Sequence, residues 1–214
     1  MAGMRTVEEL ISAAPDYYDI TVFGAEPQGN YNRVLLSSVL SGEKNVDEII
    51  IHSRDWYAQH HIRLETGSGK TVTEIRRGIA KIICQDGTTT HFDRLLIATG
   101  SRPLMPSLPG IDLKGVMGFR TLRDVETMLH YSLYHPRAIV LGGGLLGLEA
   151  AHGLAQRGMS VTVLHNHAKL LNKQLDDPAA ALLKSQLEAK GMMFEMAVQL
   201  TKIKGCLLYT SDAA

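Results

Sequence analysis

A glycine-rich turn between a predicted strand and a predicted helix constrains the fold of this chain most strongly. The segment AIVLGGGLLGLEAAHGLAQRGMSVTVLHNH, residues 138–167, carries Gly142, Gly144 and Gly147 in the spacing G-x-G-x-x-G. Gly142 permits a tight turn, Gly144 lets a pyrophosphate approach the backbone, and Gly147 allows close packing of helix and sheet. From residue 138 onward the order is strand, helix, strand, helix, strand. The pattern therefore predicts half of a doubly wound parallel sheet that binds a dinucleotide.

The residue that follows the second strand of this unit is a histidine. His165 stands 23 residues after Gly142, close to where such a unit usually places the acid that bonds the ribose of NAD, ~20 residues on. His165 is therefore a candidate cofactor-binding residue, and a solvent-facing histidine at a strand end is the alternative. With neither a carboxylate to repel a 2′-phosphate nor an arginine to bind one, the choice between NADH and NADPH stays open.

Composition argues against several other classes of protein. The formal net charge is +0, so no global basic field favours a nucleic-acid partner. The first residues reach Glu8 and Glu9 without an apolar core, and no stretch approaches ~20 apolar residues, so we expect neither a secretory signal nor a membrane span, and a cytoplasmic location. Cys84 and Cys206 are far apart in sequence; this chain alone offers no redox-active disulfide or iron–sulfur cluster. We expect Cys84 to be a buried structural thiol.

The amino-terminal half predicts a helix over residues 3–13, a short strand ending at Glu26, and further strands between residues 61 and 100. The latter include the apolar segment 94–100 and a hairpin that turns at Asp86–Gly87. The proline-rich stretch 101–110 predicts a domain boundary, and a helix is expected to open at Thr121. The segment GSGKT, residues 67–71, resembles the end of a P-loop. It lacks the earlier glycine and precedes a strand-like sequence, so we expect a loop between strands.

Three segments carry a resemblance to a known family. Met1-Ala2-Gly3 before a helix resembles the end of a second glycine fingerprint, Glu26 ends the strand that follows, and RLLIATGSRP resembles an A-T-G segment that returns the chain to a flavin. Residues 1 to about 205 thus resemble the pyridine nucleotide-disulfide oxidoreductase superfamily. VFGAEPQGNYNRVLLSSVLSGE, DRLLIATGSRP and GGGLLGLEAAHGLAQRGMSVTVLH most resemble its nitrite reductase large-subunit family. The loop around residues 31–33 stands where disulfide reductases carry their redox cysteines.

The resemblance implies an α/β, two-dinucleotide-binding-domain flavoprotein fold. Rossmann-like βαβ units would carry a β-hairpin or meander insertion, and the fold would be incomplete at both ends. The implied domains are an FAD-binding domain over 1–105, lacking its first strand, an NAD(P)-binding domain over 106–205, and a non-native tail over 206–214. The implied FAD-binding residues are Gly3, Glu26, Asn32, Arg33, Ser37, Val72, Ala98, Thr99 and Gly100. The candidates for the nicotinamide dinucleotide are Gly142, Gly144, Gly147, Glu149 and His165.

The function implied by the resemblance is hydride transfer from NAD(P)H to FAD. In the full-length protein, electrons would pass to siroheme and iron–sulfur centres outside this sequence and reduce nitrite to ammonia. Downstream redox domains or a small electron-carrier protein would be the partners, a homodimer is an expectation for the full-length form, and the piece alone is expected to be inactive. Hydride transfer demands no side-chain acid or base, so no catalytic or metal-binding residue is nominated. Two alternatives remain: a ferredoxin- or rubredoxin-reductase-like flavoprotein, and a non-catalytic nucleotide-binding fragment that does not retain FAD.

Overall fold

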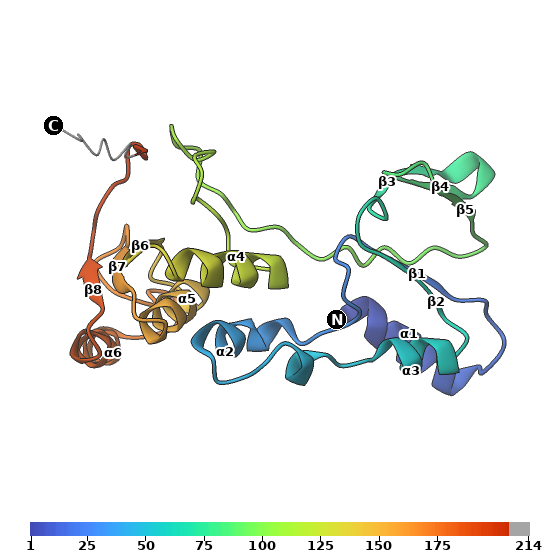
Figure 1. Ribbon diagram of the computed structural model, residues 1–214, viewed down its shortest axis with the longest axis horizontal. Coiled ribbons are helices and arrows are strands. Elements are labelled where there is room, and N and C mark those ends of the chain that lie inside the picture. Colours follow the sequence, from blue (N-terminus) through green and yellow to red (C-terminus); the bar gives the residue numbers. More distant parts are fainter. Residues whose placement is uncertain (206–214) are drawn as a thin grey trace, which may run out of the picture. The chain divides into compact units, whose positions relative to one another are not determined.

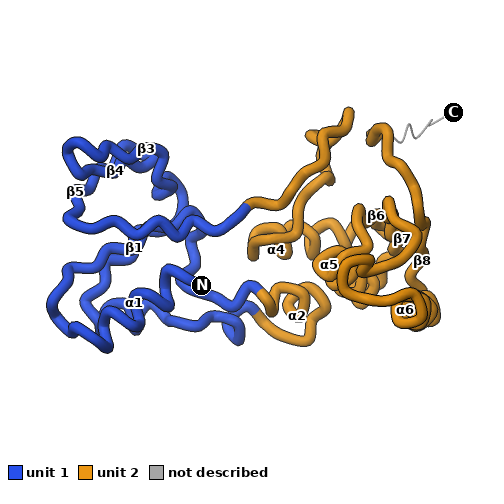
Figure 2. The backbone as a smooth tube through the Cα atoms, turned by 180° about the vertical axis from the view of Figure 1, so that it is seen from behind, with its two compact units in different colours: residues 1–33, 46–101 blue, residues 34–45, 102–214 orange. Residues whose placement is uncertain are grey.

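Two units divide the chain in the computed structural model, which describes residues 1–205. Unit 1 contains Met1–Arg33 and Val46–Ser101, and unit 2 contains Val34–Asn45 and the chain from Arg102 onward (Figure 2). A short internal segment, residues 34–45, thus groups with the second half of the sequence. The assignment of FAD to residues 1–105 and of NAD(P) to residues 106–205 stays a prediction. Cys206 and the predicted non-native tail lie outside the described residues.

Unit 1 begins with a helix packed beside a pair of parallel strands. Met4 and Val7 of this helix are buried together with Tyr57 and Ile62, which is the apolar face that the sequence spacing predicts. Thr21 pairs with Arg63 in a parallel register. The predicted strand ending at Glu26 is present but stops two residues earlier. The elements are α1 (Ala2–Ala13), β1 (Thr21–Gly24), α3 (Arg54–Gln59) and β2 (Arg63–Thr66), with 3₁₀ turns at Arg33–Leu35, which reaches into unit 2, Asp47–Ile49 and Arg77–Ile79.

An antiparallel meander follows in unit 1, and it confirms the predicted hairpin. Its strands are β3 (Val72–Arg76), β4 (Lys81–Cys84) and β5 (Thr89–His91), in the order β3-β4-β5. The turn between β4 and β5 contains Gly87 with φ 82°, a left-handed conformation that glycine adopts without steric cost. Cys84 is 3% exposed, and burial raises the pKa of its thiol, as expected for a structural cysteine. Residues 67–71 form the predicted loop between β2 and β3.

The strand predicted over residues 94–100 is wrong. This segment has no regular structure, and the side chains of Leu96 and Ile97 are 59% and 64% exposed. Apolar composition alone does not make a strand, because the backbone also needs a hydrogen-bonded neighbour. Within residues 1–205, no strand pairs with this segment.

Unit 2 contains the predicted β-α-β-α-β arrangement (Figure 1). Its three strands are parallel in the order β6-β7-β8, with Arg137 opposite Ser160 and Thr162 opposite Met193. The glycine-rich turn joins β6 to α5. Asp176 caps α6, and Pro178 lies in the first turn of this helix. The elements are β6 (Arg137–Leu141), α5 (Leu145–Gln156), β7 (Ser160–Leu164), α6 (Asp177–Ala189) and β8 (Met193–Glu195).

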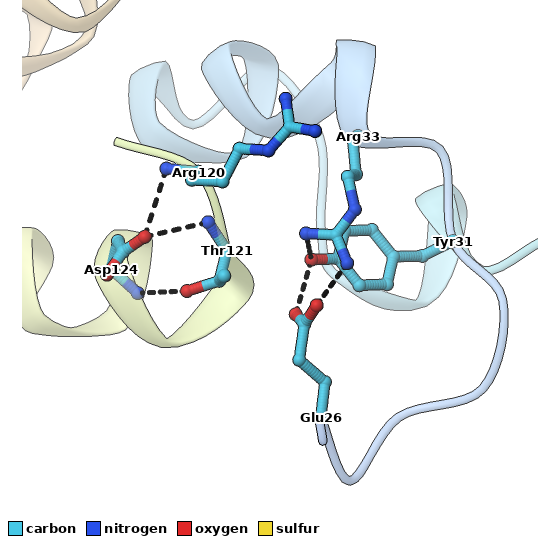
Figure 3. A network of polar contacts seen from close by, with 6 residues as sticks. All are labelled: Glu26, Tyr31, Arg33, Arg120, Thr121 and Asp124. Carbon is cyan, nitrogen blue, oxygen red and sulfur yellow. Dashed lines mark hydrogen bonds and ion pairs between the residues drawn. The ribbon is translucent and has the colours of Figure 1, made fainter. Parts of the chain in front are cut away.

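Two further helices of unit 2, α4 (Leu122–Ser132) and α2 (Leu36–Ser41), contact α5. The predicted start of α4 is confirmed: Thr121 and Asp124 form a reciprocal capping box, drawn in Figure 3. On α2, Leu40 is completely buried, and a Cβ added to Gly153 of α5 would lie 2.8 Å from its Cγ atom. Among residues 1–205, no helix is both long and apolar enough to span a membrane.

Candidate functional site

The turn between β6 and α5 has the geometry that its glycines predict. Gly142 has φ 112°, and its amide donates to the Leu164 carbonyl oxygen of β7 at 2.8 Å. A Cβ on Gly147 would lie 2.0 Å from the Gly142 carbonyl oxygen. No side chain fits there, so Gly147 is what allows α5 to start directly against the end of β6.

Gly144 lies beside open space at the beginning of α5. It is the N-cap residue, with φ −84° and with no side-chain cap among the described residues. Beyond its chain neighbours, no heavy atom of the described residues lies within 4 Å of a Cβ built on Gly144. In α5, which the structure describes over Leu145–Gln156, none of the residues of the first turn is acidic. A helix start of this kind presents free N–H groups and a partial positive charge, so it fits a phosphate.

Gly143 makes contacts in the turn that the fingerprint spacing does not predict. A Cβ on Gly143 would lie 2.6 Å from Leu170 Cδ2 and 3.0 Å from the ring of His165. Its amide donates to His165 Nδ1 at 3.1 Å, and its carbonyl oxygen accepts from the Leu171 amide at 3.0 Å. The only signal in the sequence is the unbroken triplet of glycines, because the neighbours of Gly143 come from beyond β7.

His165 is 6% exposed, so the alternative of a solvent-facing histidine is wrong. Burial is the largest cause that lowers the pKa of its imidazole, and His167 lowers it further, while the Lys169 backbone acts in the opposite direction. Its Nε2 atom has no hydrogen-bond partner among the described residues. The role of His165 toward a ribose stays a prediction. The role assigned to half-buried Glu149, on α5, stays one too.

Unit 1 has its own cluster of polar side chains beyond β1 (Figure 3). The Tyr31 hydroxyl donates to Glu26 Oε2 at 2.5 Å, and the Arg33 guanidinium forms an ion pair with the same carboxylate. Arg33 also donates to the Tyr31 hydroxyl at 2.7 Å. The structure thus brings together two predicted FAD-binding residues, Glu26 and Arg33. Tyr31, which is 4% exposed, joins them, although it was not among the predicted cofactor-binding residues.

The start of α1 lies against the A-T-G segment of unit 1. A Cβ on Gly3 would be 2.9 Å from the Cβ atom of Ala98, so these two predicted FAD-binding residues are in contact. Met1, the N-cap residue, makes no side-chain cap. Exposed Thr99 and Gly100 follow Ala98.

The remaining predicted FAD residues are dispersed. The Asn32 amide donates to the Ile49 carbonyl oxygen at 2.8 Å, and Val72 is the half-buried first residue of β3. Ser37 lies on α2, in unit 2, and its hydroxyl donates to the Val34 carbonyl oxygen at 3.5 Å. Their roles toward a flavin therefore stay predictions.

A parallel sheet with a glycine turn opening on an uncapped helix defines a dinucleotide-binding α/β protein. Residues 1–208 match the family described as pyridine nucleotide-disulphide oxidoreductase. The chain belongs to this family, which confirms the resemblance seen in its sequence.

Several proteins similar to this chain are electron-transfer enzymes. The chain is 44% identical to the assimilatory nitrate reductase electron transfer subunit of Bacillus subtilis (strain 168), over 96% of this chain and 26% of that protein. It is also 44% identical to the nitrite reductase [NAD(P)H] of the same organism, over 96% and 25%. The chain thus spans about a quarter of the length of these relatives. The ferredoxin reductase for the CYP199A2 system from Rhodopseudomonas palustris shares the fold, with a TM-score of 0.85, 22% identity, and coverage of 95% of this chain and 50% of that one.

Proposed function

We propose that this chain is the NAD(P)H- and FAD-binding part of an assimilatory nitrite reductase. The family to which the chain belongs and its 44% sequence identity to the nitrite reductase [NAD(P)H] of Bacillus subtilis support this proposal. The observation that carries it is the open space beside Gly144 at the uncapped start of α5. A pyrophosphate fits there without displacing a side chain. A cytoplasmic location and a homodimer of the full-length protein belong to the same proposal.

In unit 2, the residues of the glycine turn would hold the nicotinamide dinucleotide. Gly142 and Gly147 shape the turn, and Gly144 leaves room for the phosphates. The amides at the start of α5 donate to the phosphate oxygens. Binding and orientation are the tasks of these groups, because hydride transfer needs no acid or base from the chain.

In unit 1, the residues of α1 and of the segment after β1 fit a second dinucleotide, FAD. The uncapped start of α1 offers N–H groups, and the contact of Gly3 with Ala98 leaves no room for a side chain between them. Glu26 accepts hydrogen bonds from Tyr31 and Arg33, and its carboxylate keeps lone pairs for a ribose hydroxyl. When bound, FAD supplies the redox chemistry by accepting a hydride from NAD(P)H and passing electrons onward.

The variant Gly144→Ala tests the nucleotide site. Its methyl group meets no described atom within 4 Å, and its φ is in the ordinary range, so folding should be unchanged. The methyl group fills the phosphate space, and we expect NAD(P)H affinity to fall at least about tenfold, measured by nucleotide fluorescence. Gly78→Ala is the matched control, because a Cβ there also meets nothing within 4 Å. Equal affinity of Gly144→Ala and the wild-type chain would contradict the proposal.

The terminal acceptor needs a separate experiment, because the two Bacillus relatives are equally identical to this chain. The full-length protein should be reduced with NADH or NADPH and offered nitrite, nitrate or a ferredoxin. Production of ammonia from nitrite supports the proposal. Nitrate reduction would assign the chain to a nitrate reductase, and reduction of ferredoxin alone would assign it to the carrier reductases.

A further inference from the structure

We propose that His165 is a positioning residue for the nucleotide site: its neutral imidazole holds the Gly143 amide and keeps the glycine turn in the conformation that receives phosphate. This inference rests on the proposed function and deepens it. His165 follows β7, so the end of one strand controls the turn that leaves its neighbour β6.

The segment after β7 holds both backbone groups of Gly143. The Gly143 amide donates to His165 Nδ1 at 3.1 Å, and the Gly143 carbonyl oxygen accepts from the Leu171 amide at 3.0 Å. Leu170 is fully buried, and its Cδ2 atom occupies the space where a Cβ on Gly143 would point. Gly143 thus cannot rotate freely, and Gly142 and Gly144 on either side of it are held with it.

The direction of the hydrogen bond fixes the protonation state of His165. The amide of Gly143 is a donor, so Nδ1 must offer a lone pair, and the ring proton of the neutral imidazole resides on Nε2. A second proton on Nδ1 would place two donors face to face. It would also leave a charged ring in a buried place where Nε2 has no partner among the described residues. Protonation therefore breaks the contact with Gly143.

Some of the groups around His165 disfavour protonation of its imidazole, and others favour it. The ring of His167 lies 5.4 Å away, centroid to centroid, and disfavours a second positive charge. The Lys169 backbone favours the charged form, while the Lys169 ammonium is paired with Asp177 at 2.5 Å. From β8, the Glu195 carbonyl oxygen accepts from the His165 amide at 2.9 Å, and Glu195 itself is exposed. The start of α5 adds a partial positive charge.

The backbone of Leu171 shows that its contacts hold this segment in place. Leu171 has φ 47°, a left-handed conformation that a leucine rarely adopts. Its amide donates to Gly143 and its carbonyl oxygen accepts from the amides of Gln174 and Leu175. These contacts fix the position of the segment after β7, so this segment can hold the Gly143 turn in one conformation.

Two variants separate this role from simple packing. His165→Asn keeps an acceptor in about the position of Nδ1 but cannot gain a proton, and His165→Leu fills the space without an acceptor. For the wild-type chain, we expect NAD(P)H affinity to stay constant from pH 8 to about 6.5 and to fall at more acid pH, because burial lowers the pKa of the His165 imidazole below its ordinary value of 6.5. His165→Leu should bind weakly at every pH. His165→Asn should keep most of the affinity found at pH 8, with a flat pH profile.

A second measurement needs no nucleotide. Hydrogen exchange of the Gly143 amide in the ligand-free chain should be slow in the wild type and in His165→Asn at pH 8, and at least about tenfold faster in His165→Leu. Where His165→Leu fails to fold, comparison of the wild type with His165→Asn at acid pH replaces it. Equal exchange in the wild type and His165→Leu at pH 8, or, where His165→Leu does not fold, in the wild type and His165→Asn at acid pH, overturns the inference. Slow exchange without nucleotide binding instead contradicts the proposed function and leaves the positioning contact supported.

Discussion

Gly147 lies so close to Gly142 that a Cβ on Gly147 would be 2.0 Å from the Gly142 carbonyl oxygen. The atom that this Cβ would clash with belongs to the backbone, so the clash can be relieved only if α5 moves away from β6. We expect Gly147→Ala to lower the free energy of unfolding by about 2 kcal/mol, as overpacking does, and to abolish nucleotide binding. Urea denaturation and fluorescence titration measure the two effects. Unchanged stability together with unchanged binding would show that this close approach is absent in solution.

The contact between Gly153 and Leu40 joins α5 to α2. A Cβ at Gly153 would lie 2.8 Å from Leu40 Cγ and 2.9 Å from Cδ2. In Gly153→Val, overpacking of about 1–3 kcal/mol outweighs the few tenths gained when valine replaces glycine in a helix. The variant should therefore unfold at lower urea concentration. In a Leu40→Ala background, most of this cost should disappear, and a purely additive double-mutant cycle would argue against the contact.

Arg157, just after α5, stabilises the end of α2. Its Nε atom donates to the Leu40 carbonyl oxygen at 2.6 Å, and Nη2 donates to the Val39 carbonyl oxygen at 3.1 Å. Lysine cannot bind two carbonyl groups with the same fixed fork. We expect Arg157→Lys to cost about 1 kcal/mol and to accelerate amide exchange in α2 more than in α6. Uniform acceleration across unit 2 would contradict this local role.

Asp86 makes a pH-dependent contribution to the meander. The Thr88 backbone amide donates to its carboxylate at 2.9 Å, and Lys70 lies 3.1 Å from it; together, with Thr88 the larger cause, they lower the pKa of Asp86 from 3.8 to about 2. Since the folded chain favours the ionised form, this stabilisation is complete above pH 3.8 and is lost as the pH falls toward 2.

Asp86→Asn should therefore melt below the wild type at pH 7, and the gap between the two melting temperatures should close over the same acid range. Asp16→Asn, at an exposed carboxylate, is the control. A difference between the two melting temperatures that stays constant down to pH 2 would show that the ionised Asp86 carboxylate is not its cause.

Local signals in the sequence account for much of the fold. The glycine turn, the capping box of Thr121 and Asp124, and the hairpin at Asp86–Gly87 each depend on residues close together in the chain, so their patterns predicted them. The segment 94–100 failed because a strand also depends on a partner strand, which apolar composition does not report.

The sequence likewise predicts only part of the candidate site. The roles of Gly142 and Gly147 follow from the spacing of the fingerprint, whereas the role of Gly143 depends on Leu170 and on the ring of His165. Those contacts depend on the pairing of β7 with β6, which brings distant residues together, and the periodicity of a single sequence does not reveal them.

The grouping of residues 34–45 with unit 2 determines how this protein can be divided. The chain passes between the units at residues 33–34, 45–46 and 101–102, so one cleavage does not separate them. A fragment that starts at Arg102 would lack α2 and would expose the face of α5 around Gly153 that Leu40 now covers. Apolar surface uncovered in this way promotes aggregation. Anyone expressing the second unit alone would need to supply residues 34–45 as well, by fusion through a linker or by co-expression.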